Sequence, residues 1–173
     1  MVRWPRGQGR LTPSAALRVG RKTKRPPAVP TLFVTHGARG FVSQVSGDIR
    51  LRRVLIPVDY SPTPSQAIKA IQRFGRLLTG ENIIVHLIHV GNSVPTVNAA
   101  VPALPTVILR SGNVVKSIVD VAVEYDVDFI GMPTAGHHGV LDALRGSTTE
   151  RVIRHAPCPV FAVPAALPPG SSS

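Results

Sequence analysis

Two stretches of this sequence combine residue types that could hold an anion or a sugar. Asp59 follows directly on the apolar run of residues 54–58, so its carboxylate is expected to emerge from the end of a strand. Further along, Gly136, Gly139 and Gly146 precede the polar residues Ser147, Thr148 and Thr149. Glycines let backbone N–H groups approach an anion, and a helix that starts with Ser and Thr adds hydrogen-bond donors and a favourable dipole. The second stretch is therefore a candidate phosphate site.

Each stretch also has a purely structural interpretation. Asp59 could form the turn that follows the strand or cap the next helix, and spacing alone does not decide between these roles and ligand binding. Gly146 and Ser147 would serve equally well as an ordinary loop and N-cap.

The histidines and the cysteine are best explained without a metal or a redox site. His137 and His138 are adjacent in a loop, where surface exposure is the simpler interpretation, although His137 could face a phosphate chain. His86 and His89 fall three residues apart in a strand pattern, point to opposite faces and are expected to be structural. The lone Cys158 is expected to pack as a small apolar residue.

Familiar catalytic motifs are missing from the sequence. It has neither a Gly-Lys-Ser/Thr phosphate loop nor a Gly-x-Ser-x-Gly nucleophile elbow, and no nucleophile has an evident base. The sequence therefore favours binding over catalysis.

The elements that must position these residues alternate along the chain. Apolar runs at residues 54–58, 83–90, 107–110, 127–132 and 159–163 are typical of buried strands. Helical periodicity spans residues 64–79, with Ala67, Ile68, Ile71, Phe74, Leu77 and Leu78 as its apolar side chains and Gly80 as the stop signal. Two more helices are predicted: one is capped by Asn113, has Val115, Ile118, Val119 and Ala122 on one face and ends near Tyr125, and the other spans residues 148–155.

This order predicts an α/β domain with a mainly parallel sheet that helices cover on both faces. In such sheets ligands bind beyond the carboxyl ends of the strands, where the strand order reverses. Asp59 and the glycine-rich stretch both follow strands, so they should meet there. Residues 91–105 are expected to form a long surface loop.

The formal charge of +11 is concentrated in the first part of the chain. More than half of the 20 Lys and Arg residues precede Val54, where Asp48 is the sole acid. Residues 1–30 are expected to be a basic disordered extension, residues 52–164 the folded domain and residues 165–173 a flexible tail. Nucleic acid would bind such an extension only weakly and non-specifically. An acid-free, Arg-rich start also loosely resembles an organelle transit peptide. We favour a soluble, cytoplasmic protein without a membrane span.

A faint internal repeat precedes the domain. Residues 35–40 resemble residues 134–139, Gly47 falls opposite Gly146, and the apolar residues 32–34 precede the first copy. The interpretation is that residues 31–51 are the remnant of a degenerate tandem domain.

Residues 53–61, Arg-Val-Leu-Ile-Pro-Val-Asp-Tyr-Ser, resemble the opening strand and turn of universal stress proteins. Residues 134–163, which end in Arg-His-Ala-Pro-Cys-Pro-Val-Phe-Ala-Val, are similar to the closing third of that family. The resemblance covers about residues 52–164. It implies an open, mainly parallel five-stranded sheet with helices on both faces, of the Rossmann-like, adenine nucleotide alpha hydrolase-like kind.

The ATP-binding branch of that family carries a glycine, two residues, a second glycine, nine residues and then Gly-Ser/Thr. Here Pro133 replaces the first glycine, the second is Gly136, and Gly146-Ser147 end the motif. Proline lacks an N–H and fixes φ, so a backbone contact available to glycine is lost. The full set of nucleotide-binding residues implied by the resemblance is Pro57, Val58, Asp59, Val90, Met132, Pro133, Gly136, His137, Gly139, Gly146, Ser147, Thr148 and Thr149.

The resemblance implies a stress-response protein that binds ATP, with Mg²⁺ or Mn²⁺ as an accompanying ion, and whose output is conformational or partner-directed. At most slow ATP hydrolysis is expected. The rival interpretation is a nucleotide-free dimerisation or chaperone-like module, which the replacement at Pro133 favours. The resemblance also implies a homodimer formed through the last strand, residues 159–163.

Overall fold

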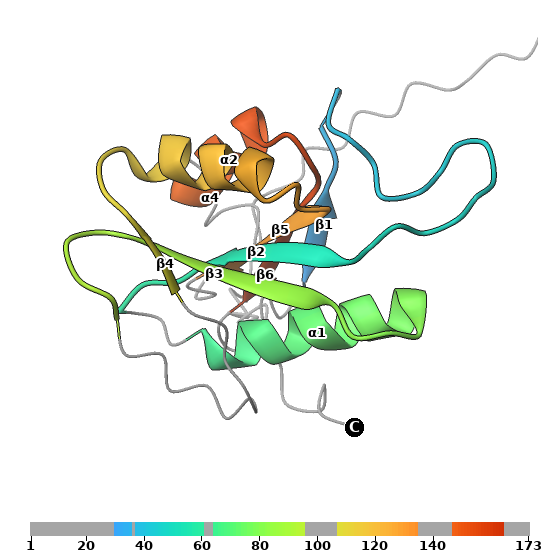
Figure 1. Cartoon of the computed structure of the whole chain (residues 1–173), viewed down its shortest axis with the longest axis horizontal. Coiled ribbons are helices and arrows are strands. Elements are labelled where there is room, and N and C mark those ends of the chain that lie inside the picture. The colour runs from blue at the N-terminus through green and yellow to red at the C-terminus, as the bar shows by residue number, and fades with distance from the viewer. Residues whose placement is uncertain (1–29, 36, 61–63, 96–106, 135–146, 165–173) are drawn as a thin grey trace, which may run out of the picture.

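The computed structural model describes residues 30–35, 37–60, 64–95, 107–134 and 147–164, and they form one sheet with helices on both faces (Figure 1). The predicted extension, the tail and most of the glycine-rich stretch lie outside the described residues. In chain order the elements are β1 (Thr31–Phe33), β2 (Arg53–Pro57), α1 (Ser65–Thr79), β3 (Ile84–Val90), β4 (Val107–Arg110), α2 (Val114–Glu124), β5 (Phe129–Thr134), α4 (Thr148–His155) and β6 (Val160–Pro164).

The sheet has six strands in the order β1-β6-β5-β2-β3-β4. Strands β2 to β6 are parallel to one another, which confirms the predicted mainly parallel α/β sheet. The sixth strand is β1, which pairs antiparallel with β6 and was not predicted as a member of the sheet. Helix α1 covers one face, and α2 and α4 cover the other (Figure 1).

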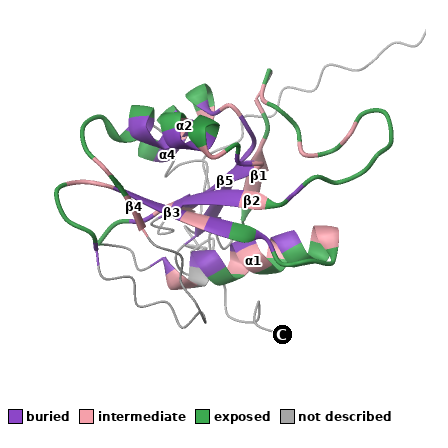
Figure 2. Ribbon diagram, viewed as in Figure 1, coloured by how far each residue is buried: buried purple, intermediate pink, exposed green. Residues whose placement is uncertain are grey.

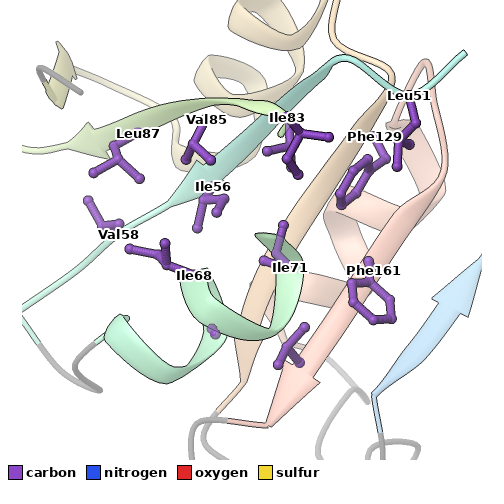
Figure 3. Packing of buried hydrophobic residues seen from close by; sticks show 13 residues of the cluster. Leu51, Ile56, Val58, Ile68, Ile71, Ile83, Val85, Leu87, Phe129 and Phe161 are labelled. Carbon is purple, nitrogen blue, oxygen red and sulfur yellow. The ribbon is translucent and has the colours of Figure 1, made fainter. Parts of the chain in front are cut away.

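The apolar core is divided between the two faces of the sheet. One cluster packs Val54, Ile56 and Phe129 beneath Ile68 and Ile71 of α1 (Figure 3). The other packs Leu55, Ile88 and Ile130 against α2 and α4. Adjacent strand residues face opposite clusters, as the pleat requires. The central strands are buried along most of their length, as continuous apolar runs predict (Figure 2).

The predicted stop signal of α1 and the predicted cap of α2 both act as expected. Gly80 ends α1 in the left-handed conformation, with φ 73°, and its N–H donates to the carbonyl of Arg76. Asn113 caps α2 by accepting a hydrogen bond from the amide of Lys116 at 3.0 Å. The prediction that Leu77 belongs to the apolar face of α1 is wrong. Its side chain is 76% exposed, because it lies on the flank of α1 that turns away from the sheet. Val119 of α2 is only half-buried, whereas Val121, which the pattern missed, is fully buried.

Gly131 in β5 is where α1 approaches the sheet most tightly. A Cβ at this position would lie 2.3 Å from Cδ1 of Ile71, which is itself fully buried. We predict that Gly131→Ala lowers the free energy of unfolding by about 1–3 kcal/mol, because overpacking forces side chains or backbone to move. Chemical denaturation measures this loss.

Two further variants test whether the loss in Gly131→Ala comes from a clash with Ile71. Gly40→Ala is the matched control, since no heavy atom lies nearer than 4.0 Å to its added Cβ. Ile71→Val removes the colliding Cδ1, so the double variant Gly131→Ala/Ile71→Val should lose less stability than the two single losses combined. Additive losses would contradict a direct clash.

His86 in β3 is expected to make stability depend on pH. Its ring lies 4.9 Å from that of Tyr125, and its Nε2 has no hydrogen-bond partner among the described residues. Burial, and secondarily the charge of Arg53, lower the pKa of His86 below the ordinary 6.5. Below pH 6.5 the unfolded chain therefore binds the proton more readily than the folded one, and stability falls as the pH drops towards the folded-state pKa. His86→Leu should lose this dependence when denaturation is compared at pH 8 and pH 5; an unchanged slope would contradict the assignment.

Candidate functional site

The sheet opens between β2 and β5. These neighbours pair only at Val54 with Phe129 and at Leu55 with Ile130. From β2 the chain builds outward through β3 and β4, and from β5 it builds in the opposite direction through β6. The crevice beyond these two pairs is therefore the point where the strand order reverses, as the parallel topology predicts.

A cavity of about 250 Å³ lies at this opening. Its walls come from the ends of β2, β3 and β5 and from the first turns of α2 and α4. The lining residues are Pro57, Val58, Asp59, Pro64, Ile88, His89, Val90, Val114, Ile118, Met132, Pro133, Thr148 and Thr149. The two segments that sequence reasoning singled out, Asp59 and the Thr148-Thr149 pair, thus meet at one cavity.

The predicted site residues fall into three groups. Eight of them line the cavity: Pro57, Val58, Asp59, Val90, Met132, Pro133, Thr148 and Thr149. Ser147 does not line it; its hydroxyl caps α4 and accepts a hydrogen bond from the amide of Glu150 at 3.2 Å, so the N-cap interpretation of this residue is confirmed. Gly136, His137, Gly139 and Gly146 lie outside the described residues.

His89 is a cavity residue that sequence reasoning treated as structural only. It is 5% exposed, its Nδ1 lies 2.9 Å from the carbonyl oxygen of Val58, and its ring meets that of Tyr60 edge-on at 5.3 Å. A Cβ on Gly91 would lie 2.5 Å from Nε2 of His89, so this glycine leaves room for the imidazole. In the sequence, Gly91 directly after the strand was the signal that could have identified His89 as a cavity residue.

The rim of the cavity joins two loops. The hydroxyl of Tyr60 lies 2.6 Å from Oγ of Ser93 and donates to the Ser93 carbonyl at 3.0 Å, which ties the segment after β2 to the segment after β3. Asp59 is exposed, and its Oδ1 accepts a hydrogen bond from the amide of Tyr60 at 2.8 Å. The carboxylate thus has a local turn contact.

The lining carries little charge. Asp59 is the one acidic side chain among the described lining residues, and no Lys or Arg is among them. The described residues contain no group of three or more His, Cys, Asp or Glu side chains that could hold a metal ion. Among the described residues, the starts of α2 and α4 both reach the cavity, and the first turn of a helix carries a partial positive charge.

Thr134 follows the two lining residues of β5 directly. Its hydroxyl is buried and has no hydrogen-bond partner within the described part of the chain. An unsatisfied buried polar group costs about 1–3 kcal/mol, which a water or ligand atom at the strand end would recover.

Cys158 lies outside the cavity and is 1% exposed. Burial raises the pKa of its thiol to about 12. The predicted role as a small apolar core residue is confirmed, since a thiol with so high a pKa is a poor nucleophile.

Residues 96–164 match the sequence model of the universal stress protein family. Over these residues the chain is similar to universal stress proteins. The resemblance seen in the sequence is thereby confirmed, and the six-stranded sheet contains the five parallel strands that it implied.

One solved structure of a universal stress protein shares this fold, and two others are similar to this chain over about two thirds of its length. One from Archaeoglobus fulgidus is 27% identical with a TM-score of 0.55, over 79% of this chain and 50% of that one, so this chain spans half the length of that protein. UspA from Lactobacillus plantarum is 19% identical, with a TM-score of 0.48 over 67% of this chain and 99% of that one. A universal stress protein in complex with cAMP is 17% identical, with a TM-score of 0.47 over 66% and 98% of the respective chains.

The comparison with curated proteins gave no match. Among the helices that the structure describes, none has the length and apolar character needed to cross a membrane.

Proposed function

We propose that this domain binds an adenine nucleotide, with ATP as the first candidate, and that binding acts through conformation or a partner. The observation that carries the proposal is the cavity at the reversal of strand order, where Asp59 meets the start of α4. An acceptor for sugar hydroxyls and a set of donors for phosphate lie on the same opening, as a nucleotide requires.

The size of the cavity favours a nucleoside as the enclosed part. A volume of about 250 Å³ is slightly below the roughly 300–1,000 Å³ typical of small-molecule pockets. Adenosine would occupy it between the ends of β2 and β3, with Val58 and Val90 beside the base and Asp59 accepting from the ribose. The phosphates would then extend past Thr148 and Thr149.

The chain's own residues supply donors at the phosphate end. The Thr148 and Thr149 hydroxyls lie at the cavity, and the first amides of α4 add a positive dipole end. Mg²⁺ or Mn²⁺ would accompany the phosphates, which bring their own oxygen ligands. We expect at most slow hydrolysis, because the described lining offers Asp59 and His89 but no cation to stabilise developing charge.

A nucleotide-free stress module is the second candidate. Two observations favour it: Pro133 lines the cavity where the motif has glycine, and the described lining has no cationic side chain. Under this candidate the output would be dimerisation or chaperone-like binding. The stress-response role and the cytoplasmic location remain predictions under either candidate.

The nucleotide proposal predicts saturable binding that depends on Asp59. Titration of the full chain with a fluorescent ATP analogue in the presence of Mg²⁺ should saturate, and Asp59→Ala should weaken binding about tenfold, because a hydrogen bond to a charged group contributes about 1.5–3 kcal/mol.

Glu81→Gln is the control for Asp59→Ala, since it removes an exposed acid that does not line the cavity. Competition with adenosine, AMP and ATP identifies the part of the ligand that is recognised. Absence of saturable binding at millimolar ligand would reject the proposal and favour the nucleotide-free candidate.

Pro133 provides a separate test of the two candidates. Pro133→Gly should raise nucleotide affinity, because it restores both an N–H and free backbone dihedrals. Pro133→Ala restores the N–H alone, so a comparison of the three proteins by titration shows which property matters. Equal affinities in all three would show that Pro133 does not limit binding.

A further inference from the structure

Strand β1 closes an edge of the sheet that would otherwise be open. It pairs antiparallel with β6, whose other side pairs with β5 (Figure 1). The side chains of β6 are buried along its whole length. An open edge beside such a strand would present a row of unpaired N–H and C=O groups, which readily recruits another strand.

The sequence around β1 resembles the sequence around β6. When residues 25–34 are set against residues 154–163, Arg25, Pro30 and Val34 fall on Arg154, Pro159 and Val163. The three residues of β1, Thr31, Leu32 and Phe33, then fall on Val160, Phe161 and Ala162. This alignment makes β1 the counterpart of β6. The repeat noted above would instead make it the counterpart of β5.

The register of the pairing agrees with that alignment. Leu32 lies opposite Phe161, its own counterpart. Thr31, the counterpart of Val160, lies opposite Ala162, and Phe33, the counterpart of Ala162, lies opposite Val160. Two identical strands related by a two-fold axis through Phe161 would pair in the same way. The sequence alignment and the strand register are independent observations, and both centre on Leu32 and Phe161.

Contacts on both faces hold β1 and the segment after it in place. Leu32 packs with the core cluster that contains Phe161, and Phe33 packs with Ala162 and Ile153 on the other face. The amide of Arg39 donates to the Pro157 carbonyl at 2.8 Å, and its guanidinium pairs with Asp126 and donates to the Val127 carbonyl at 2.9 Å. Because β1 is three residues long and half-buried, these contacts can be removed by few substitutions.

We infer that β1 takes the place of a second copy of β6, and that it covers a self-complementary edge within one chain. With β1 in place the edge is closed, and β6 does not pair with a second copy of the chain. When β1 is displaced, β6 pairs with β6 of a second copy of this chain, about the same two-fold centre at Phe161. The homodimer predicted through residues 159–163 is therefore the released state. This inference does not depend on nucleotide binding.

Light scattering of full-length variants tests the inference. Wild type should have the monomer mass of 18.4 kDa. Leu32→Asp/Phe33→Asp places a charge on each buried face of β1, which should release the strand because burial of an unpaired charge is costly, and double the mass. The matched control is Val42→Asp/Val45→Asp, which adds the same charges at exposed positions of the same segment and should remain a monomer.

Disulfide trapping tests the register. In a Cys158→Ser background, Thr31→Cys/Ala162→Cys should form an intrachain bond, because directly opposed strand residues have the required spacing. In the released variant, Val160→Cys/Ala162→Cys should instead give a covalent dimer, since these residues oppose each other across the two-fold axis.

Three outcomes would overturn the inference. The first is a wild-type dimer, and the second is a released variant that is folded by circular dichroism yet monomeric. The third applies even if the released variant fails to fold: interchain bonds in the Thr31→Cys/Ala162→Cys protein would show that β1 does not close the edge of its own chain.

Discussion

The divergence of β2 and β5 is the constraint on which the candidate site depends. Two residue pairs join these strands, and beyond them each strand is held only by its outer neighbour. Side chains from two layers therefore reach the gap: His89 and Asp59 from one side, and Met132, Pro133 and the start of α4 from the other. Tighter pairing between β2 and β5 would close the cavity without changing a single lining residue.

Much of this fold follows from local sequence signals because the relevant forces are local. Continuous apolar runs and period-3.6 patterns report burial, and Gly80 and Asn113 act on the backbone within a few residues. The signals fail where a distant partner decides. Leu77 fits the helical pattern, yet no element in the described part of the chain covers its flank of α1. Strand β1 is three residues long and gains its structure only from the edge of β6. His89 becomes a cavity residue through the Val58 carbonyl and the space above Gly91.

The charge of the cavity constrains how it could recognise a nucleotide. The described lining offers one carboxylate and no cation, so most of the discrimination would come from the base and the ribose. Helix α4 adds a partial positive charge through its first turn, and its capping hydroxyl, that of Ser147, already accepts from the Glu150 amide. A ligand bound in this way would owe little of its affinity to the outer phosphates. A difference in affinity between ATP and AMP would then depend on residues 135–146 or on an accompanying divalent cation.

The cavity and the closed edge are separated by a single strand. Pro133 lines the cavity and lies opposite Val163, and the preceding residue of β6, Ala162, lies opposite Thr31 of β1. The amide of Ile130 donates to the Pro159 carbonyl at the start of β6, so by the alternation of a strand the Pro133 nitrogen faces away from β6, and β5–β6 pairing is continuous from Ile130 to Thr134. A shift of β6 on exchange of its edge partner would reach the wall of the cavity through these pairs. Such a path couples the two sites only if β6 moves as a unit, and its burial on both faces favours rigid movement over local bending.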